Sequence, residues 1–508
     1  METPREPFSE AMTDRQKTVW PKTLHRVPGL AAARGMWILE RHSMFDVNSF
    51  QQSNRRDWLK VAGMGTMAAA APAIVPASVL GENAPSKRIN LAMLGCGHQS
   101  QRLIPSFLVH PACRFVAVCD VNKRGTGYYH PDQILGRETA KGWIEDYYAG
   151  ETRSGRYKGC DTYVDFRDVL ARDDVDAVVI AVPDHWHAIM AIAAMAAGKD
   201  VYCEKPLALT IREGRAMVDA VRRYNRVFQT GAQFRSSPAV RRACELVRNG
   251  RLGEIRRVRT WVAGNHFDSP GPGWQPQPIP AGFDYDFWLG SAPLAPFHME
   301  RCFHRWRYIR DYSNGQTTNF GAHTNDIAQW GLGMDGTTPI EYEDNGSEFL
   351  PAGSLFDTAS KTAFKARYAN GVELICETRS SSATKFEGTE GRLEITLGGK
   401  LVTYPENIRD SVIGAGEIRL PVSNPDHQQH VRDDVDADHA GDFLRAIQQG
   451  RDPIEPVEIG HSTATLCILG SIAQIVKRPF KWNPATERSD DDEVNSMLER
   501  PFRAPWSI

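Results

Sequence analysis

The sequence predicts a two-domain α/β protein, in which an N-terminal doubly wound parallel domain precedes a C-terminal α+β domain with a large open mixed sheet. Between residues 88 and 231, short apolar stretches alternate with helical patterns, and the first of them runs into a glycine-rich turn. This alternation is typical of a parallel sheet with helices on both faces. We expect a leader at 1–85, a first domain at 86–232 and a second at 233–508, since 508 residues exceed one ordinary core.

Charge and cysteine content narrow the classes of function. The formal net charge is -2 and hydrophobic residues make up 41% of the chain, as in ordinary globular proteins. This balance gives no electrostatic reason to expect nucleic acid as a partner. The nine cysteines include no C-x-x-C pair. We expect Cys96, Cys119 and Cys203 to be small buried residues rather than zinc ligands or disulfide partners.

An export leader is predicted before the first domain. Residues 54–60 (NRRDWLK) resemble the twin-arginine motif, with Trp58 where phenylalanine is usual, and an alanine-rich apolar stretch follows. Pro72 and Pro76 make that stretch a poor membrane span, but it suits the apolar region of a signal. We expect twin-arginine export to the periplasm or cell envelope, and no stable membrane span in the mature chain. The alternatives are a disordered tail with a chance arginine pair, and a translation start at Met44.

The first strand and its turn carry a nucleotide-binding pattern. Residues 88–94 are a strand pattern that leads into Gly95-Cys96-Gly97-His98-Gln99-Ser100 and then into a helical pattern. Gly95 allows a tight turn, and Gly97 lets the backbone approach a pyrophosphate at the helix N-terminus, as in a Rossmann domain. Ser100 stands where a third glycine or alanine is usual, so the motif is imperfect. We predict that Gly95, Gly97 and His98 bind the cofactor.

A carboxylate at the end of the second strand indicates which dinucleotide is bound. Residues 115–119 form an apolar strand that ends in Asp120, near the position where a carboxylate binds the adenosine ribose hydroxyls. A carboxylate there repels a 2′-phosphate, so we expect NAD. NADP is the alternative because Lys123 and Arg124 follow closely. Asp120 could also be a polar cap on the strand end.

The alternation of strands and helices continues through the first domain. A polar, tyrosine-rich insert follows Asn122. Further along the chain, Lys205 comes directly after a strand that is expected to be buried, in the segment Glu204-Lys205-Pro206. Ligands bind at the carboxyl ends of parallel strands, so Lys205 is a poor candidate for a merely solvated side chain. The expected elements are a helix at 132–148, a strand at 176–183, a helix at 188–197, a strand at 200–203, a helix at 213–224 and a strand at 227–230.

The order of these motifs resembles the Gfo/Idh/MocA oxidoreductases. The glycine turn, the strand-end Asp120, residues 182–187 (VPDHWH) and residues 202–210 (YCEKPLALT) follow one another as in that family, and the EKP segment is the most specific part. The resemblance implies that Lys205 reaches the nicotinamide and the substrate. It also places three further residues beside the cofactor: Pro183, His187 and Glu204.

His185 and His187 form an H-x-H pair that could bind zinc. No cysteine or carboxylate completes a ligand set at typical spacing. We therefore expect no metal site and interpret the pair as packing on the cofactor side.

The second domain is predicted from separate strands and from further resemblance. Strands at 362–368, 372–378 and 393–397 indicate a mixed open sheet, and residues 271–280 are a proline- and glycine-rich loop expected over the site. A helix at 238–249 and a strand at 255–262 precede that loop. Segments 283–290, 460–467, 480–484 and 500–506 resemble larger, often exported, bacterial members of the family. The resemblance implies that the sheet is an oligomer interface, so we expect a homo-oligomer.

The second chemical cluster lies at residues 319–330 (NFGAHTNDIAQW). The resemblance implies that His323 exchanges the substrate hydroxyl proton, a task that suits a base with a pKa near the working pH. Asn319 replaces the family's aspartate; it can hold the imidazole by a hydrogen bond but cannot stabilise its charged form. Asp326 would share the helical face of His323 and could compensate. The alternative role of His323 is packing against the nearby helix.

The predicted function is NAD(P)-dependent oxidation of a secondary alcohol of a sugar or cyclic polyol, with Lys205 on the substrate oxygen, His323 as proton acceptor and Asn319 beside it. Two alternatives stay open. Export with a trapped cofactor favours a redox-neutral sugar lyase or hydrolase, whereas Asn319 and Ser100 would also suit a non-catalytic sugar-binding or scaffold protein. The aromatic side chains that could stack on a sugar ring are Trp274, Trp288, Trp306 and Tyr308.

Overall fold

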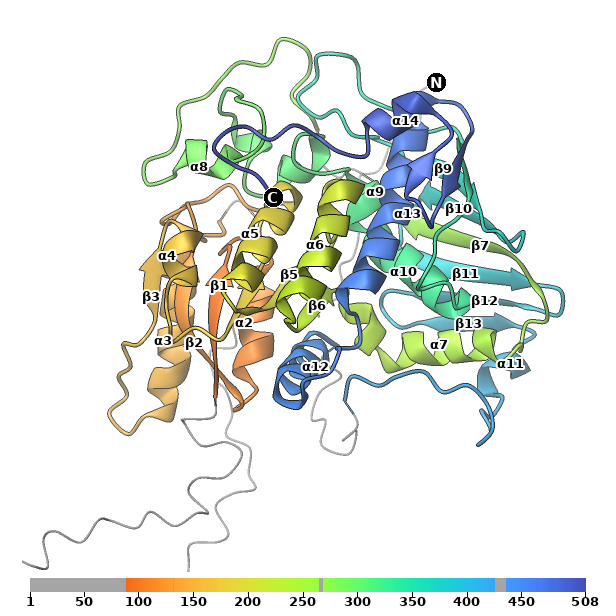
Figure 1. Cartoon of the computed structure of the whole chain (residues 1–508), viewed down its shortest axis with the longest axis horizontal. Helices are drawn as coiled ribbons and strands as arrows, with labels where there is room; N and C mark the ends of the chain where they lie inside the picture. Colours follow the sequence, from red (N-terminus) through yellow and green to blue (C-terminus); the bar gives the residue numbers. More distant parts are fainter. Residues whose placement is uncertain (1–87, 131, 265–267, 425–434) are drawn as a thin grey trace, which may run out of the picture. The chain divides into compact units, whose positions relative to one another are not determined.

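A six-stranded sheet forms the first half of the fold (Figure 1). The computed structural model describes residues 88–508 except 131, 265–267 and 425–434, all of them within Pro76–Ile508, the larger of the two units into which the chain divides. The predicted leader, including its arginine pair and Met44, lies outside the described residues.

The strand order of this sheet is β3-β2-β1-β4-β5-β6, and every neighbouring pair is parallel. This is the order of doubly wound dinucleotide-binding domains, in which the crevice for the ligand opens where the order reverses, here between β1 and β4. The predicted fold of the first domain is therefore confirmed. The strands are β1 (Ile89–Leu94), β2 (Cys113–Cys119), β3 (Asp161–Tyr163), β4 (Ala177–Ile180), β5 (Asp200–Glu204) and β6 (Phe228–Gly231).

The helices that accompany this sheet differ from the predicted ones mainly at their starts. Pro183 is the N-cap of α5, which therefore begins at Asp184 rather than at residue 188 and carries both histidines of the H-x-H pair. Helix α3 begins at Arg137, five residues after the predicted start at residue 132, because Gly136 has a φ of 118°, which no α-helix allows. Helix α6 begins at a capping box of Thr210 and Glu213. The helices are α2 (Ser100–Leu108), α3 (Arg137–Glu151), α4 (Phe166–Leu170), α5 (Asp184–Ala196) and α6 (Ile211–Tyr224).

A nine-stranded mixed sheet forms the second half, in the order β13-β12-β11-β7-β10-β9-β8-β14-β15. β7 and β10 are parallel, and the other neighbouring pairs are antiparallel. The predicted large mixed sheet is confirmed. Its strands are β7 (Ile255–Val262), β8 (Glu341–Asp344), β9 (Ala363–Arg367), β10 (Glu373–Thr378), β11 (Ala383–Gly388), β12 (Arg392–Thr396), β13 (Leu401–Tyr404), β14 (Phe480–Asn483) and β15 (Arg488–Ser489).

Two long helices near the C-terminus tie the halves together. α12 (Val435–Gln449) packs on α2, and α13 (Val457–Val476) lies along α6 and also contacts β8 and β9 (Figure 1). α13 is long and apolar enough to cross a membrane, but 83% of its apolar window is buried inside the fold. The remaining helices are α7 (Pro238–Arg248), α8 (Tyr285–Leu289), α9 (Gln316–Asn319), α10 (Gly321–Leu332), α11 (Asn407–Asp410) and α14 (Asp492–Ser496).

The core of both halves is mainly apolar, with a smaller set of buried polar and charged side chains. One cluster joins the inner faces of the two sheets, and a second, aromatic cluster around Phe283, Trp288 and Tyr312 comes mainly from residues 283–312. All nine cysteines are free and buried. The expectation that Cys96, Cys119 and Cys203 are small buried residues is confirmed.

Candidate functional site

A cleft opens at the carboxyl ends of the parallel strands. One wall consists of the turns that follow β1, β2, β4 and β5. The opposite wall consists of the aromatic cluster, residues 303–307 and Asn319 at the end of α9. The cleft therefore lies where a doubly wound sheet places its ligand.

The glycine turn after β1 has the backbone that the sequence predicts. Gly95 has a φ of +93°, and a Cβ at this position would lie 2.3 Å from the carbonyl oxygen of Ala181. A Cβ on Gly97 would come within 3.3 Å of the Tyr128 ring, so its absence leaves room for a ligand at the turn. Ser100 replaces the third glycine without disrupting the turn, because its hydroxyl donates to the carbonyl oxygen of Gly97 over 2.7 Å. This cradle fits a dinucleotide pyrophosphate.

Asp120 and His98 both line the cleft beside this turn. Asp120 accepts hydrogen bonds from the backbone N–H of Cys96 (2.5 Å) and of Asn122 (2.7 Å), so it also caps the strand end. Burial raises the pKa of this carboxyl, which these N–H groups partly offset. The Nδ1 atom of His98 lies 3.3 Å from Gln133 Oε1, and burial lowers the pKa of the imidazole. Both residues lie where the sequence predicts cofactor contacts.

Lys205 and Asn319 meet across the cleft. The Lys205 ammonium donates to Asn319 Oδ1 (2.9 Å) and to the Asn319 carbonyl oxygen (3.3 Å). The Asn319 amide donates in turn to Gln316 Oε1 over 2.9 Å, which fixes its orientation. Burial lowers the pKa of Lys205. Burial also raises the pKa of Glu204 to about 7, and Gln99 from the glycine turn donates to that carboxyl over 2.9 Å.

His323 is held differently from the prediction. Asn319 bonds Lys205 and Gln316 instead of the imidazole, and the cleft wall does not include His323. Its ring packs edge-on against Phe234, and within the described residues its buried Nδ1 has no hydrogen-bond partner. Burial lowers the pKa of His323 well below its usual range, and the charge of Lys205 is the second cause of this shift. Burial thus moves the pKa of His323 away from the working pH in the folded chain, and a catalytic role for His323 stays a prediction.

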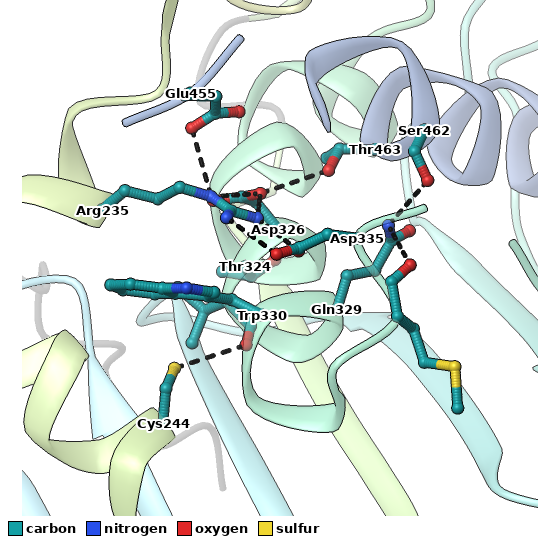
Figure 2. A network of polar contacts seen from close by, with 12 residues as sticks. Arg235, Cys244, Thr324, Asp326, Gln329, Trp330, Asp335, Glu455, Ser462 and Thr463 are labelled. Atoms are coloured by element: carbon teal, nitrogen blue, oxygen red, sulfur yellow. Dashed lines mark hydrogen bonds and ion pairs between the residues drawn. The ribbon is translucent and has the colours of Figure 1, made fainter. Parts of the chain in front are cut away.

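Asp326 cannot compensate for Asn319, and that expectation is also wrong. Its carboxylate is engaged by the buried Arg235, whose Nη2 lies 2.6 Å from Asp326 Oδ1 (Figure 2). Thr463 donates to the same carboxylate over 3.2 Å. The spacing in the sequence places Asp326 and His323 on one face of the helix. In the folded chain, however, Asp326 pairs with Arg235 from another segment.

Pro183 lines the cleft, whereas His185 and His187 lie behind its wall. The two ring nitrogens of His187 lie 2.8 Å from the Pro206 carbonyl oxygen and 3.0 Å from the Val182 carbonyl oxygen. Burial lowers the pKa of His187 to about 4. His187 thus connects the turns after β4 and β5, which positions Lys205 indirectly. Within the described residues, no group of three or more His, Cys, Asp or Glu could hold a metal.

The aromatic residues divide into two groups. Trp288 and Trp306 line the cleft. The Trp274 ring instead contacts Arg301, whose guanidinium carbon lies 5.3 Å from the ring centroid. Tyr308 lies in the core and is only 2% exposed. Of the four candidates for sugar stacking, the cleft thus offers only Trp288 and Trp306.

Sequence reasoning missed two charged residues of the cleft wall. Asp184 follows β4 and accepts a hydrogen bond from the Ser313 hydroxyl over 2.6 Å, and burial raises its pKa to about 7. Arg307 comes from the opposite wall. Asp184 was visible as the aspartate of the VPDHWH stretch, whereas only the fold brings Arg307 to this site.

Comparison with known proteins assigns both halves. The family model GFO_IDH_MocA, described as oxidoreductase family, NAD-binding Rossmann fold, matches residues 143–232. The companion model, described as oxidoreductase family, C-terminal alpha/beta domain, matches residues 257–408.

Individual relatives agree with this assignment. The chain is 43% identical to levoglucosan dehydrogenase of Pseudarthrobacter phenanthrenivorans over 95 residues, which are 19% of this chain and 24% of that protein. It is 28% identical to a glycosyl hydrolase family 109 protein of Shewanella baltica over 219 residues, 40% of this chain and 44% of that protein. The chain thus spans less than half the length of these curated relatives.

The fold has solved counterparts. The crystal structure of an oxidoreductase domain protein from Kribbella flavida matches with a TM-score of 0.54 at 21% identity, over 78% of this chain and 99% of that chain. The two family models occur in the expected order on the two halves of the fold. Residues 143–232 thus match the NAD-binding Rossmann model, and residues 257–408 the C-terminal model, of one oxidoreductase family, Gfo/Idh/MocA.

Proposed function

We propose that the protein oxidises a secondary alcohol of a sugar or cyclic polyol with NAD as the cofactor. The observation that carries the proposal is the position of Lys205, which lines the same cleft as the glycine turn and Asp120. The name of the relative levoglucosan dehydrogenase supports a sugar substrate. Trp288 and Trp306 add apolar surface to the cleft wall for a sugar ring, although Tyr285 stacks on Trp288 and Arg307 lies over Trp306.

The chain's own residues supply binding and proton transfer. When bound, NAD supplies the hydride acceptor for the alcohol. Gly95, Gly97 and Asp120 would hold the dinucleotide. Burial lowers the pKa of Lys205, so its ammonium gives up a proton more readily than that of an exposed lysine; the neutral amine can then accept the hydroxyl proton and, once charged again, donate to Asn319 Oδ1. The proposal assigns this proton to Lys205 rather than to His323, because the imidazole lies outside the cleft wall.

The proposal is tested with purified protein and a panel of sugars and cyclic polyols. We expect NADH formation with some of them, and dinucleotide in the supernatant of the denatured protein. Retention of the dinucleotide would suit a protein that is exported folded, as we propose for the leader. Failure to bind NAD, together with no turnover, would favour a non-catalytic scaffold.

Replacing Asp120 with asparagine is expected to narrow the preference for NAD over NADP by about 10- to 100-fold, the scale of lost charge-assisted hydrogen bonds. Asparagine keeps the shape but no longer repels a 2′-phosphate; its single amide oxygen can accept from only one of the N–H groups of Cys96 and Asn122, which bond different oxygens of Asp120. Dissociation constants for both dinucleotides measure the effect, with the exposed Asp168→Asn as the control. Equal affinity of the unmodified protein for NAD and NADP would contradict the role of Asp120.

Replacing Asn319 with aspartate is expected to move the acid limb of the kcat profile to higher pH by about 1–3 pH units. A carboxylate at the position of Asn319 Oδ1, 2.9 Å from the Lys205 ammonium, stabilises the charged form and raises the pKa of Lys205. The amine then loses its proton only at higher pH. Asn314→Asp is the matched control, because Asn314 bonds the Leu209 carbonyl instead. An unchanged profile in Asn319→Asp would rule out Lys205 as the proton acceptor.

A redox-neutral reaction is the second candidate. The similarity to glycosyl hydrolase family 109 proteins favours it, as does the uncharged Asn319. The two reactions differ in their products: net dehydrogenation accumulates NADH, whereas a redox-neutral cycle releases a cleaved sugar without accumulating NADH. Product analysis with aryl glycosides and catalytic NAD therefore separates them.

A further inference from the structure

Within the described residues, Arg307 is a cation of the cleft wall that forms no salt bridge, although the charge of Asp184 acts on it. Its Nη1 donates to the carbonyl oxygen of His304, and its guanidinium lies over the Trp306 ring, 4.6 Å from the centroid. The neighbouring arginines of the same segment are paired, Arg305 with Glu300 and Arg310 with Asp357. Within the described residues, by contrast, no carboxylate lies at ion-pair distance from Arg307.

The geometry leaves the guanidinium available to a ligand. The His304 carbonyl takes one N–H, and within the described residues no hydrogen bond occupies Nε or Nη2. The Trp306 ring and the His304 carbonyl oxygen restrict the movement of the group. A guanidinium presents parallel N–H donors that match the two oxygens of a carboxylate or a phosphate.

The surrounding charges also favour an anion. Lys205 and Arg307 line the cleft together, and burial lowers the pKa of both. The nearby carboxyls, Asp184 and Glu204, have pKa values raised to about 7 and bond Ser313 and Gln99 respectively. Near neutral pH they are therefore only partly ionised. An unpaired charge inside a protein is costly, which makes an anionic ligand the most direct reason to keep this arginine.

We propose that Arg307 binds an anionic group of the substrate, so that the enzyme acts on an acidic sugar, a uronate or a sugar phosphate, in preference to a neutral one. This inference rests on the proposed function and names its substrate class. The charge of Arg307 acts on Lys205 and Asp184, after β5 and β4, which favours an anion on the substrate, although it also acts on His98 of the glycine turn. The pyrophosphate of the cofactor fits instead at the glycine turn after β1.

Binding to the NAD-loaded protein tests the inference without turnover. Titration calorimetry compares D-glucuronate and D-glucose 6-phosphate with D-glucose. At least one anionic ligand is expected to bind about 10- to 100-fold more tightly than glucose, the scale of hydrogen bonds to charged groups, and Arg307→Gln is expected to abolish that difference. Arg307→Lys keeps the charge but loses the fork, and is expected to retain part of the preference. Arg310→Gln, on the same segment and outside the cleft, is the matched control.

The dissociation constant for NAD identifies the source of the anion. If it stays within about threefold in Arg307→Gln while the preference for the acidic sugar disappears, the anion is on the substrate. If NAD binding weakens about tenfold or more and the unmodified protein shows no acid preference, the guanidinium serves the cofactor and the inference is overturned. Equal binding of glucose and both anions overturns it as well. Failure of the unmodified protein to bind NAD would count against the proposed function itself, and circular dichroism shows that Arg307→Gln is folded.

Discussion

Replacing Lys205 with alanine is expected to lower kcat by about two to four powers of ten while NAD stays bound, the usual scale for losing a positioned polar catalyst. Lys205 follows β5 directly and lines the cleft, where its amino group bonds Asn319 over 2.9 Å. In the part of the chain that the structure describes, the Lys205 amino group bonds Asn319 and not the glycine turn or Asp120, which would hold the dinucleotide. In Lys205→Ala, kcat should therefore fall while the dissociation constant for NAD stays nearly unchanged.

Three further measurements make the Lys205 result interpretable. Lys205→Met preserves most of the side-chain volume, so equal losses in the methionine and alanine variants would assign the effect to the amino group rather than to a cavity. Lys141→Met, on α3 and paired only with Glu145, is the control for removal of a lysine. Thermal unfolding checks that each variant is folded. Full turnover in Lys205→Ala would remove the proposed mechanism.

The sheets could be predicted because their strands are short apolar runs between turn residues. β4 is buried at every position, and its run of aliphatic residues is what a parallel strand covered on both faces requires. The glycine turn was predictable for a similar local reason, since Gly95 occupies a backbone conformation that a side chain would block. Helix α13 was not predicted as a helix, because it is buried on all sides and shows no amphipathic pattern.

The parts of the site that depend on distant segments could not be predicted. Spacing placed Asp326 on the face of His323, but Arg235, which precedes it by 91 residues, forms its bonds. In the same way, Asn319 turns its amide oxygen to Lys205, 114 residues away, rather than to the histidine of its own segment. Local spacing states which contacts are within reach, and burial together with charge decides which of them form.

Replacing Arg235 with methionine is expected to lower the free energy of unfolding by about 3–5 kcal/mol, the cost of leaving a buried ion pair without one partner. Figure 2 shows the guanidinium between three carboxyl groups and above the Trp330 ring. Its Nη2 lies 2.6 Å from Asp326 and 2.7 Å from Asp335, and its Nε lies 3.4 Å from Glu455. The side chains of Arg235, Asp326 and Glu455 are each 1% exposed, so water cannot replace the lost cation.

Urea denaturation near pH 7 measures this loss, and Arg222→Met is the control. Arg222 is 54% exposed and pairs with Glu458 at the surface, so its removal should cost no more than about 1 kcal/mol. A loss in Arg235→Met as small as in the control would show that water reaches the cluster or that its carboxyls are neutral without Arg235.

Glu455 gives the cluster a pH dependence of defined sign. Burial raises the pKa of Glu455 well above its usual range, and the charge of Asp326 is the second cause. Within the described residues, neither carboxyl oxygen of Glu455 has a hydrogen-bond partner. The folded state therefore keeps a proton that the unfolded chain releases above its ordinary pKa of about 4.3. As the pH rises through that value toward the folded pKa, this group progressively lowers the free energy of unfolding. Glu455→Gln should remove the decline, so that it unfolds less readily than the unmodified protein at pH 8 and approaches it near pH 4. In the Arg235→Met background the same change should recover part of the lost stability at pH 8, because glutamine avoids the free-energy cost of keeping a proton on Glu455, whose pKa rises further without the cation. If Glu455→Gln were instead less stable than the unmodified protein at pH 8, Glu455 would be ionised in the folded state. Arg235 would then form ion pairs with the carboxylates of both Asp326 and Glu455.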